Sequence, residues 1–528
     1  MTTTYLGLST GFHDAAITVL QDEKIVFAGH SERYSKEKHD KDLCNGIMRE
    51  ALSYGEPGVI AYYEKPWLKK LRQLYAGQYS DAFNTHNLTV KSILNRSFPG
   101  LDLKKTTRFE HHSHHLSHAA GSFQTSPFTK ATVVIIDAIG EWDTVSIMAA
   151  DYDKKTSKAR YKPLWRQRYP HSIGLFYSAM TASVGLRPLD EEYILMGMAG
   201  YGGKDPHEHE RRTNELIESL VQSFDSCQFK QNLHLGLACS ENDLDRINTI
   251  NSPIKLSEQA SYDIAATAQS VVELLISAVM RKASSFGYSK NLVYSGGVAL
   301  NCLANRSLGS YGFDNVWIMP NPGDAGSSLG AAALSYGKMI DWHGSGAPYL
   351  GYNIVGEYPV NRVMRCLLDN KIAGVASGKA EFGPRALGNR SLLADPRGDD
   401  IKDRVNSIKH RQKFRPFAPV ILEEHCAEYF EMPESGFDGK SPYMQVIGKC
   451  KRPDLFPAIV HIDGTSRVQT VAADCPSGIR QLLEAWYAET GGCPMLLNTS
   501  LNIRGEPMVN DLADAKRFED KYGVTVFS

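Results

Sequence analysis

Residues 111–141 read HHSHHLSHAAGSFQTSPFTKATVVIIDAIGE, and the predicted fold is built around them. If the HHLSHAAGSF portion is helical, histidines four positions apart share one face and come close enough to bind one metal ion. Two such pairs exist, His111 with His115 and His114 with His118, and spacing alone does not choose between them. The alternative is an ordinary solvated histidine-rich segment.

The same stretch continues into the β-branched run ATVVIID, which predicts a buried strand with Asp137 at its carboxyl end. Open α/β sheets bind ligands at that end of their strands. Asp324 lies in a similar loop after the strand predicted from VWIM, between Gly323 and Gly326. These two carboxylates would complete a metal site with one of the histidine pairs.

Composition bounds the class of protein. A chain of 528 residues is too long for one hydrophobic core, so at least two domains are expected. Its 58 basic and 59 acidic residues balance, so no overall positive charge attracts the protein to nucleic acid or to a membrane surface. Nine irregularly spaced cysteines without a CxxC pair, no secretory leader and no long apolar span predict a reduced, cytoplasmic enzyme.

Three short strands are predicted near the start, at Tyr5–Ser9, in AAITVL and at Lys24–Gly29, with His13 in the polar turn after the first. The charged run at 30–40 predicts a solvated helix start, although at a sheet edge it could bind an anion. Lys65–Arg72 forms a local basic patch that leaves nucleic acid open.

Glycines after strands indicate a nucleotide. Gly296 and Gly297 follow the strand LVYS and let the backbone approach a ligand, while the next helix start favours phosphate. Gly140 follows Asp137, an arrangement typical of actin-like ATPases. DEEYILMGMAGYGG is predicted as a loop, residues 203–255 as an irregular surface insertion and residues 341–354 as a linker.

Residues 361–528 carry arginine clusters in EFGPRALGNRSLLADPR, IKHRQKFRPFAPV, HIDGTSRVQTV and LLNTSLNIRGEP. Arginines among glycine and proline on short loops indicate a pocket for several anionic groups. Surface salt bridging is the alternative, and four clusters in one region make it less attractive.

Twelve motifs in one order make the chain resemble, nearly end to end, the ATP-dependent O-carbamoyltransferases of the antibiotic and nodulation-factor type. They are GFHDAA, SERYSKEKHD, HHLSHAA, IDAIGEW, PHSIGLFYSA, EYILMGMAGYG, SGGVALN, NPGDAGSSLGAA, EFGPRALGNRSLL, KFRPFAP, HIDGTSRVQTV and LLNTSLNIRGEP. The resemblance implies an α/β protein with an ASKHA (actin-like, ribonuclease H-like) domain at residues 1–345 and a YrdC-like α/β domain at residues 346–528.

The resemblance also implies the reaction. In such enzymes the second domain joins carbamoyl phosphate and ATP into carbamoyl-adenylate, and the first transfers the carbamoyl group to an acceptor hydroxyl. ATP with Mg²⁺, carbamoyl phosphate and Fe²⁺ or another divalent metal are therefore expected. The expected acceptor is a small molecule such as a sugar or antibiotic, with no membrane partner, bound to a monomer or homodimer.

Other readings remain open. A 5-hydroxymethyl pyrimidine in a nucleotide or DNA is an alternative acceptor. An actin-type kinase or ATPase would leave the arginine-rich half without a role. A non-catalytic, metal-stabilised interaction protein would leave the motifs unexplained.

The resemblance assigns roles to individual residues. Among the histidines, HHLSH selects His114 and His118, which with Asp137 and Asp324 would hold the metal. The resemblance also implies that His13 is the general base and that Lys38 polarises the carbamoyl oxygen. It implies nucleotide contacts in the first domain at Gly140, Gly296, Gly297 and Asn301. It implies a carbamoyl phosphate and ATP site in the second domain at Arg385, Lys409, Arg415, Arg467, Asn498 and Ser500.

Two positions depart from the family pattern. Ile194 follows Tyr193 where a lysine is common, and Gly200 replaces the usual proline in AGYG. These departures, with the insertion at 203–255, predict an unusual acceptor.

Overall fold

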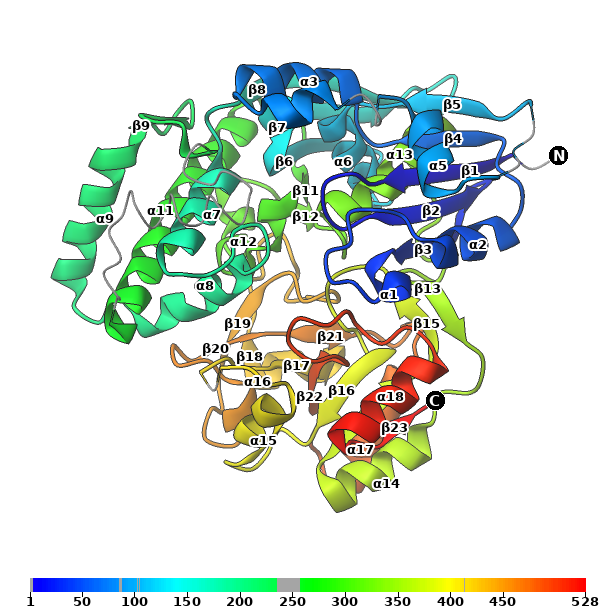
Figure 1. Ribbon diagram of the computed structural model, residues 1–528. Coiled ribbons are helices and arrows are strands. Elements are labelled where there is room, and N and C mark those ends of the chain that lie inside the picture. Colours follow the sequence, from blue (N-terminus) through cyan, green and yellow to red (C-terminus); the bar gives the residue numbers. More distant parts are fainter. Residues whose placement is uncertain (1–2, 85–87, 102, 104, 235–256, 413) are drawn as a thin grey trace.

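The N-terminal part of the chain contains two five-stranded sheets of the same plan (Figure 1). The computed structural model describes residues 3–84, 88–101, 103, 105–234, 257–412 and 414–528. The strand orders are β3-β2-β1-β4-β5 and β8-β7-β6-β11-β12. In each sheet the first three strands are antiparallel and the last two run parallel to the first. This duplicated order is that of the actin-like fold, so the predicted ASKHA architecture is confirmed.

The strands of the two sheets are β1 (Thr4–Ser9), β2 (Ala16–Gln21), β3 (Lys24–His30), β4 (Val59–Tyr62) and β5 (Arg108–His111), and β6 (Lys130–Gly140), β7 (Asp143–Tyr152), β8 (Ala159–Arg168), β11 (Asn291–Ser295) and β12 (Asn315–Trp317). β6 shows why the sequence folds this way. Val133–Ile136 is fully buried, and burying each such side chain stabilises the fold by about 1.5–3 kcal/mol.

Two helices, α6 (His114–Phe123) and α13 (Ser327–Tyr336), pack between the sheets. α13 contacts β1, β2 and β4, while α6 contacts β6 and β11. The helices approach so closely that a side chain on Gly330 would lie 1.8 Å from the carbonyl oxygen of Ser117. This crossing brings the α6 histidines next to the turn that precedes α13.

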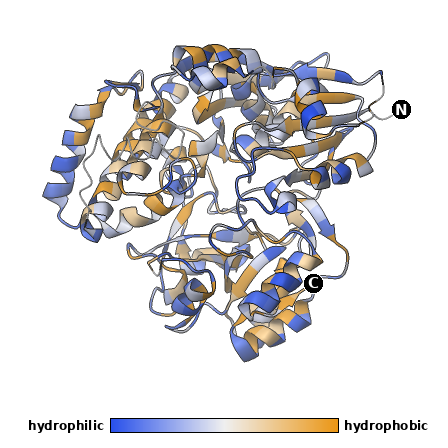
Figure 2. Ribbon diagram, viewed as in Figure 1, coloured by the Kyte–Doolittle hydropathy of each residue, from blue (hydrophilic) through white to orange (hydrophobic). Residues whose placement is uncertain are grey.

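The remaining N-terminal helices are α1 (Glu32–Ser35), α2 (Asn45–Ser53), α3 (Pro66–Tyr75), α4 (Tyr79–Phe83), α5 (Val90–Ser97), α7 (Ile173–Ser183), α8 (Glu192–Met198), α9 (Pro206–Leu220), α11 (Glu258–Ser285) and α12 (Cys302–Asn305). α11 packs against α7, α8 and α9. Figure 2 shows hydrophobic residues along the central strands and hydrophilic residues along the outer side of α9.

The C-terminal part is built on a six-stranded mixed sheet with the order β21-β17-β22-β16-β14-β23. Helices and strands here are α14 (Val360–Asn370), α15 (Ile401–Ile408), α16 (Cys426–Tyr429), α17 (Ile479–Glu489) and α18 (Leu512–Tyr522), with β13 (Tyr349–Ile354), β14 (Ile372–Ala376), β15 (Gly378–Glu381), β16 (Arg390–Ala394), β17 (Ala418–Leu422), β18 (Phe430–Glu431), β19 (Ile447–Cys450), β20 (Thr465–Arg467), β21 (Gln469–Val471), β22 (Met495–Ser500) and β23 (Val526–Phe527). The sheet has its own core around Trp486. A second, α/β domain is thus confirmed.

Several local predictions were wrong. The stretch predicted as a glycine-rich loop forms α8, because Ile194, Leu195 and Met198 are buried on one face. Part of the predicted irregular insertion is α9, which Asp205 caps by accepting from two backbone N–H groups; residues 235–256 of that insertion lie outside the described residues. The predicted linker contains β13, which pairs with β15.

Two further corrections concern burial. The charged run after β3 is not simply solvated, because Glu32 and Arg33 are buried. The predicted absence of a long apolar span is also wrong: α11 is long and apolar enough to cross a membrane. Since 61% of its most apolar window is buried inside the protein, α11 has the character of a core helix.

Candidate active site

Four side chains converge between the two sheets. His114 and His118 lie one turn apart on α6, Asp137 lies in β6, and Asp324 lies in the short turn before α13. The two histidine Nε2 atoms are 3.1 Å apart, and each is 3.3 Å from Asp324 Oδ1. Asp137 Oδ2 is 3.2 Å from His114 Nε2. All four side chains are buried, and we call them the histidine–aspartate cluster.

Asp137 is not at the end of its strand as predicted, since β6 continues to Gly140. Its pairing with β7 becomes irregular between Ile136 and Gly140, however. Irregularities of this kind re-aim a side chain next to a functional site. The effect here is to place a carboxylate within reach of α6.

The donor set of this cluster fits a divalent metal ion. One nitrogen or oxygen atom from each residue lies within 4.8 Å of the other three. Only one of two facing Nε2 atoms can donate to the other, whereas a shared cation accepts the lone pairs of both. Two imidazoles and two carboxylates suit Fe²⁺, Mn²⁺ or Zn²⁺. Glu64 Oε2 lies 3.9 Å from His114 Nδ1, close enough for charge attraction but too far for a hydrogen bond, and that Nδ1 has no hydrogen-bond partner.

Electrostatics couple this cluster to protons. Burial lowers the pKa of His114, but Asp324 and Asp137 outweigh it and hold that pKa well above its usual value. Burial raises the pKa of Asp324, but the charge and hydrogen bond of His114 lower that pKa by more, so this carboxyl stays ionised. Protons and a metal ion compete for the same atoms, so metal binding weakens as the pH falls.

The structure separates the two histidine pairs that spacing left open. His115 Nδ1 lies 2.6 Å from the Ser146 hydroxyl, away from the cluster. His111 lies on the edge strand β5. Among the four candidates, only His114 and His118 meet the two aspartates.

The glycines predicted to contact a nucleotide lie around the same cluster. The Gly297 N–H donates to Asp137 Oδ1 over 3.0 Å, and Gly296 turns the chain with a φ of 94°. A side chain on Gly140 would lie 2.5 Å from the His114 ring. Gly297 lines the cavity described next, whereas Gly140 and Gly296 are absent from the described residues that line it.

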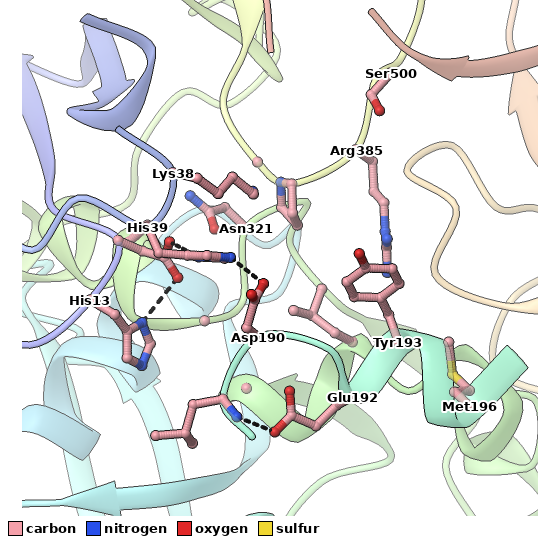
Figure 3. A pocket seen from close by; sticks show the side chains of 18 of the residues that line it. His13, Lys38, His39, Asp190, Glu192, Tyr193, Met196, Asn321, Arg385 and Ser500 are labelled. Carbon is pink, nitrogen blue, oxygen red and sulfur yellow. Dashed lines mark hydrogen bonds and ion pairs between the residues drawn. The ribbon is translucent and has the colours of Figure 1, made fainter. Parts of the chain in front are cut away.

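A chain of hydrogen bonds positions His13 (Figure 3). His13 Nδ1 is 3.0 Å from Asp14 Oδ2, Asp14 Oδ1 is 2.8 Å from His39 Nδ1, and His39 Nε2 is 2.5 Å from Asp190 Oδ1. Because the Asp14 carboxylate accepts from Nδ1–H, the free lone pair of His13 is on Nε2. That atom lies 3.9 Å from Asp324 Oδ2, next to the histidine–aspartate cluster.

The same hydrogen bonds set the charge of the chain. Burial lowers the pKa of His13, but Asp14 and Asp324 outweigh it and raise that pKa above its ordinary value. Burial also lowers the pKa of His39, which the hydrogen bonds to Asp14 and Asp190 raise to about 9. His39 is therefore held as a cation between two carboxylates at neutral pH.

A first cavity of about 420 Å³ joins the two domains. Its N-terminal wall includes His13, Lys38, Asp137, Asn301 and Asp324. Its C-terminal wall carries six cations, of which Arg504 lies 2.7 Å from Glu191. We call the other five the cation cluster: Arg385, Lys409, Arg411, Arg415 and Arg467. Figure 3 shows Lys38, Arg385 and Ser500 around one space.

No member of the cation cluster forms an ion pair with a carboxylate among the described residues. Burial, followed by repulsion from Arg467, lowers the pKa of Arg385 to about 9. Burial also lowers the pKa of Arg467, and its Nε has no hydrogen-bond partner. Lys409 is buried, and the four arginines are half-buried. Cations withdrawn from water without counter-charges are costly, and an anionic ligand would offset that cost.

Polar groups complete this wall. Lys409 Nζ donates to Ser500 Oγ over 3.1 Å and to Asn502 Oδ1 over 2.7 Å. Asn498 donates to Gln469 over 2.7 Å, while its Oδ1 has no partner. Ser500 and Asn498 both come from β22, whose end faces the cavity.

Sequence reasoning missed several residues of this site. Asp14 and His39 sit inside the quoted motifs GFHDAA and SERYSKEKHD, so their positions were visible but their pairing was not. Asp190 and Arg411 also lie in quoted stretches, DEEYILMGMAGYGG and the arginine cluster IKHRQKFRPFAPV, but neither was singled out as a site residue. Tyr193 lies 4.9 Å below the Arg415 guanidinium, and only the fold of α8 reveals this contact.

The two departures from the family pattern have structural explanations. Ile194 is 1% exposed and is not among the described residues that line the cavity. Having isoleucine instead of lysine at this position therefore removes no cation from the cavity wall. A side chain on Gly200 would lie 2.2 Å from the ring of His461. That ring is fixed, because its Nε2 is 2.9 Å from the Gly197 carbonyl and it stacks edge-on against Tyr201.

Comparison with known proteins places this geometry in a family. Residues 4–333 match the model "Carbamoyltransferase N-terminus" and residues 364–527 match "Carbamoyltransferase C-terminus". The predicted boundary at 345/346 lies between the two matches and stays a prediction.

Curated relatives cover almost the whole chain. The nodulation protein NolNO of Sinorhizobium fredii is 31% identical over 96% of this chain and 76% of its own length. Nodulation protein U of the same organism is 28% identical over 93% and 92%. The uncharacterised protein sll1178 of Synechocystis is 32% identical over 97% and 93%.

Solved structures give weaker likenesses. The activator of 2-hydroxyisocaproyl-CoA dehydratase from Clostridium difficile covers 64% of this chain and 94% of its own, with 15% identity and a TM-score of 0.31. Full-length HypF covers 63% and 55%, also with 15% identity and a TM-score of 0.31. The fold assignment above rests on the strand order instead. The two family matches and the relatives together show that the chain belongs to the carbamoyltransferase family, as an enzyme that transfers carbamoyl groups.

Proposed function

We propose that this enzyme is an O-carbamoyltransferase that uses ATP and carbamoyl phosphate. One observation carries the proposal: a single cavity has the unpaired cation cluster on one wall and, on the other, His13 with Asp137 and Asp324, the two aspartates of the histidine–aspartate cluster. Several fixed cations offset the repulsion between two highly negative substrates. The opposite wall suits chemistry on the product of that reaction.

The first step belongs to the C-terminal domain. Water cleaves carbamoyl phosphate into carbamate and phosphate, and a carbamate oxygen then attacks the α-phosphorus of ATP. The bond to pyrophosphate breaks, and pyrophosphate leaves with the electron pair and Mg²⁺. Arg385, Arg415, Arg467 and Lys409 hold the phosphates, while Asn498 and Ser500 supply neutral polar contacts.

The second step belongs to the N-terminal domain. An acceptor hydroxyl attacks the carbamoyl carbon, the bond from that carbon to the adenylate oxygen breaks, and AMP leaves with the electron pair. His13 Nε2 takes the hydroxyl proton, and Lys38 polarises the carbamoyl oxygen. A divalent ion such as Fe²⁺ in the histidine–aspartate cluster would supply the positive charge that stabilises AMP as a leaving group. Asn301 and Gly297 lie where the adenosine part would bind.

Pyrophosphate release from ATP, with and without carbamoyl phosphate, tests the proposal. We expect release that depends on carbamoyl phosphate, before any acceptor is added. ATP cleavage to ADP and phosphate, indifferent to carbamoyl phosphate, would move the kinase or ATPase reading to first place. Acceptors are then screened among sugars, antibiotics and hydroxymethylated nucleosides, nucleotides and DNA. We expect the enzyme to work in the reducing environment of the cytoplasm.

A further inference from the structure

A tyrosine of the N-terminal domain lies among the cations of the C-terminal domain. Tyr193, on α8, lines the cavity between the domains, and its ring centre is 4.9 Å from the Arg415 guanidinium carbon. Figure 3 shows its side chain pointing from α8 toward Arg385. Burial lowers the pKa values of Arg385, Arg411 and Arg415, and Tyr193 opposes each of these shifts. The phenol is therefore within electrostatic reach of three of the four arginines of the cation cluster.

The fold of α8 directs this side chain into the cavity. Ile194, Leu195 and Met198 are buried in the core of the N-terminal domain, whereas Tyr193 is 38% exposed. Because an amphipathic helix buries its apolar side, the opposite side of α8 is left to face the C-terminal domain. The N-terminal core thus fixes the ring against which Arg415 lies.

The contact holds Arg415 without neutralising it. Arg504, on the same wall, lies 2.7 Å from the Glu191 carboxylate, so its charge is balanced within the protein. Arg415 pairs with none of the described carboxylates and rests on the face of the Tyr193 ring instead. A ring face orients a guanidinium through a cation–π interaction, which is strongest where water is partly excluded. The full positive charge of Arg415 therefore remains available to a phosphate.

The N-terminal domain also holds the backbone beside Arg415. The Tyr201 hydroxyl donates to the Phe414 carbonyl over 2.9 Å, and the two rings lie 5.6 Å apart. Tyr201 belongs to the turn that follows α8. One segment of the N-terminal domain thus contacts both the side chain of Arg415 and the peptide before it.

The loop that carries Arg385 is anchored in a similar way. The buried Arg33 guanidinium donates to the Gly383 carbonyl over 3.0 Å. A side chain on Gly383 would lie 2.7 Å from the Pro320 carbonyl oxygen, so this loop packs directly on the N-terminal domain. The cation cluster is therefore held from both domains, although all its members come from one.

We propose that Tyr193 is a positioning residue for the first step, and that it acts by holding the Arg415 guanidinium toward the phosphates in the cavity. The inference rests on the proposed function and goes beyond it, because it makes the N-terminal domain part of the site that forms carbamoyl-adenylate. Arg415 contacts the substrates, and Tyr193 acts through Arg415. No bond to Tyr193 forms or breaks.

Substitutions that separate the ring from the hydroxyl test the proposal in the full-length enzyme. Tyr193→Leu removes the ring face, and we expect kcat/KM for carbamoyl-phosphate-dependent pyrophosphate release to fall about 10-fold, the effect of a partly desolvated cation–π contact. Tyr193→Phe keeps the ring beside Arg415 and should retain this quantity within about 3-fold. A phenylalanine variant as impaired as the leucine variant would overturn the proposal, because the hydroxyl would then be the group that matters.

A double-mutant cycle tests whether Tyr193 acts through Arg415. Once Arg415→Met has removed the guanidinium, adding Tyr193→Leu should lower pyrophosphate release by less than about 2-fold more, because the contact is already lost. Rates are measured from quenched time points at high enzyme concentration. A further loss of about 10-fold in the double variant would mean that Tyr193 works independently of Arg415, and would overturn the proposal.

Another arginine–tyrosine pair provides the matched control. The Arg281 guanidinium carbon lies 6.0 Å from the centre of the Tyr311 ring, and neither residue is among the described residues that line the cavity. Tyr311→Leu removes a contact of the same kind and should leave pyrophosphate release unchanged. Metal content and the midpoint of urea unfolding report that both leucine variants are folded. Equal kinetic losses in Tyr193→Leu and Tyr311→Leu would contradict a positioning role.

The two levels of proposal fail differently. If carbamoyl-phosphate-dependent pyrophosphate release is absent in the unmodified enzyme, the proposed function itself fails. If that release is present but Tyr193→Leu behaves like the Tyr311→Leu control, only the inference about Tyr193 fails.

Discussion

A second cavity, of about 950 Å³, lies in the N-terminal domain and shares Asp324 with the cavity between the domains, and the two differ in how the protein treats their charges. In the first, the lining carboxylates come from the N-terminal domain and five unpaired cations come from the C-terminal domain, whereas the N-terminal cations Lys38 and His39 lie beside carboxylates of their own wall. In the second, acids and bases come from the same N-terminal domain, and Lys69, Arg96 and Arg187 each pair with a carboxylate. Separated charges attract charged ligands, whereas paired charges offer hydrogen bonds to neutral ones. Which substrate goes where follows from pairing more than from the number of charges.

The largest effect should come from the unpaired wall. Arg467→Met removes a half-buried cation that pairs with none of the described carboxylates, and we expect carbamoyl-phosphate-dependent pyrophosphate release to fall roughly 100- to 1,000-fold, as for lost contacts between fixed cations and phosphates. The rate of pyrophosphate release, from samples quenched at fixed times, measures this loss. Arg306→Met, at an exposed position, should retain full activity. Equal losses in both variants would contradict a special role for the cation cluster.

Breaking the junction between the cavities should affect only the second step. His114→Ala removes one of the four clustered donors, so we expect metal affinity to fall at least about 100-fold and carbamoyl transfer to be lost. Metal content and acceptor carbamoylation measure the loss. Pyrophosphate release should persist, and chelation of the unmodified enzyme should give the same split. Loss of the first step in both His114→Ala and Arg415→Ala would contradict the division of labour between the domains.

The smallest effect concerns stability. The pKa of His39 is raised to about 9 in the fold, against about 6.5 for an unperturbed histidine. A raised pKa stabilises the folded state fully below pH 6.5, and this contribution is lost as the pH rises to about 9. His39→Gln should therefore flatten the pH dependence of the free energy of unfolding across this window. Urea titrations at several pH values measure it, and an unchanged slope would contradict the paired geometry of His39.

Sequence predicted the parts of this enzyme that depend on local pattern. The β-branched run gave β6, histidine spacing gave the two candidate pairs, and the arginine clusters gave a pocket for anions. The α8 helix was missed because two glycines suggested a loop, whereas burial of Ile194 and Leu195 decided the matter. Tertiary packing overrides weak local preferences of this kind.

Contacts between side chains that are far apart in the sequence could not be predicted from it. His39 contacts Asp190, 151 positions later, and Lys69 pairs with Glu64 while lining a cavity that also includes His114. A motif names residue types, but whether an arginine is free or held by a carboxylate depends on neighbours brought together by topology. That property decides what each cavity binds.

The contact between Gly200 and His461 links the two halves of the molecule in evolution. The glycine belongs to the turn after α8 and the histidine to the C-terminal domain, so a larger residue at position 200 requires the side chain at position 461 to shrink or move. A relative with proline at position 200 should carry a smaller side chain at position 461. The halves of different relatives are thus not interchangeable parts, and chimeras should assemble only when these two positions are exchanged together.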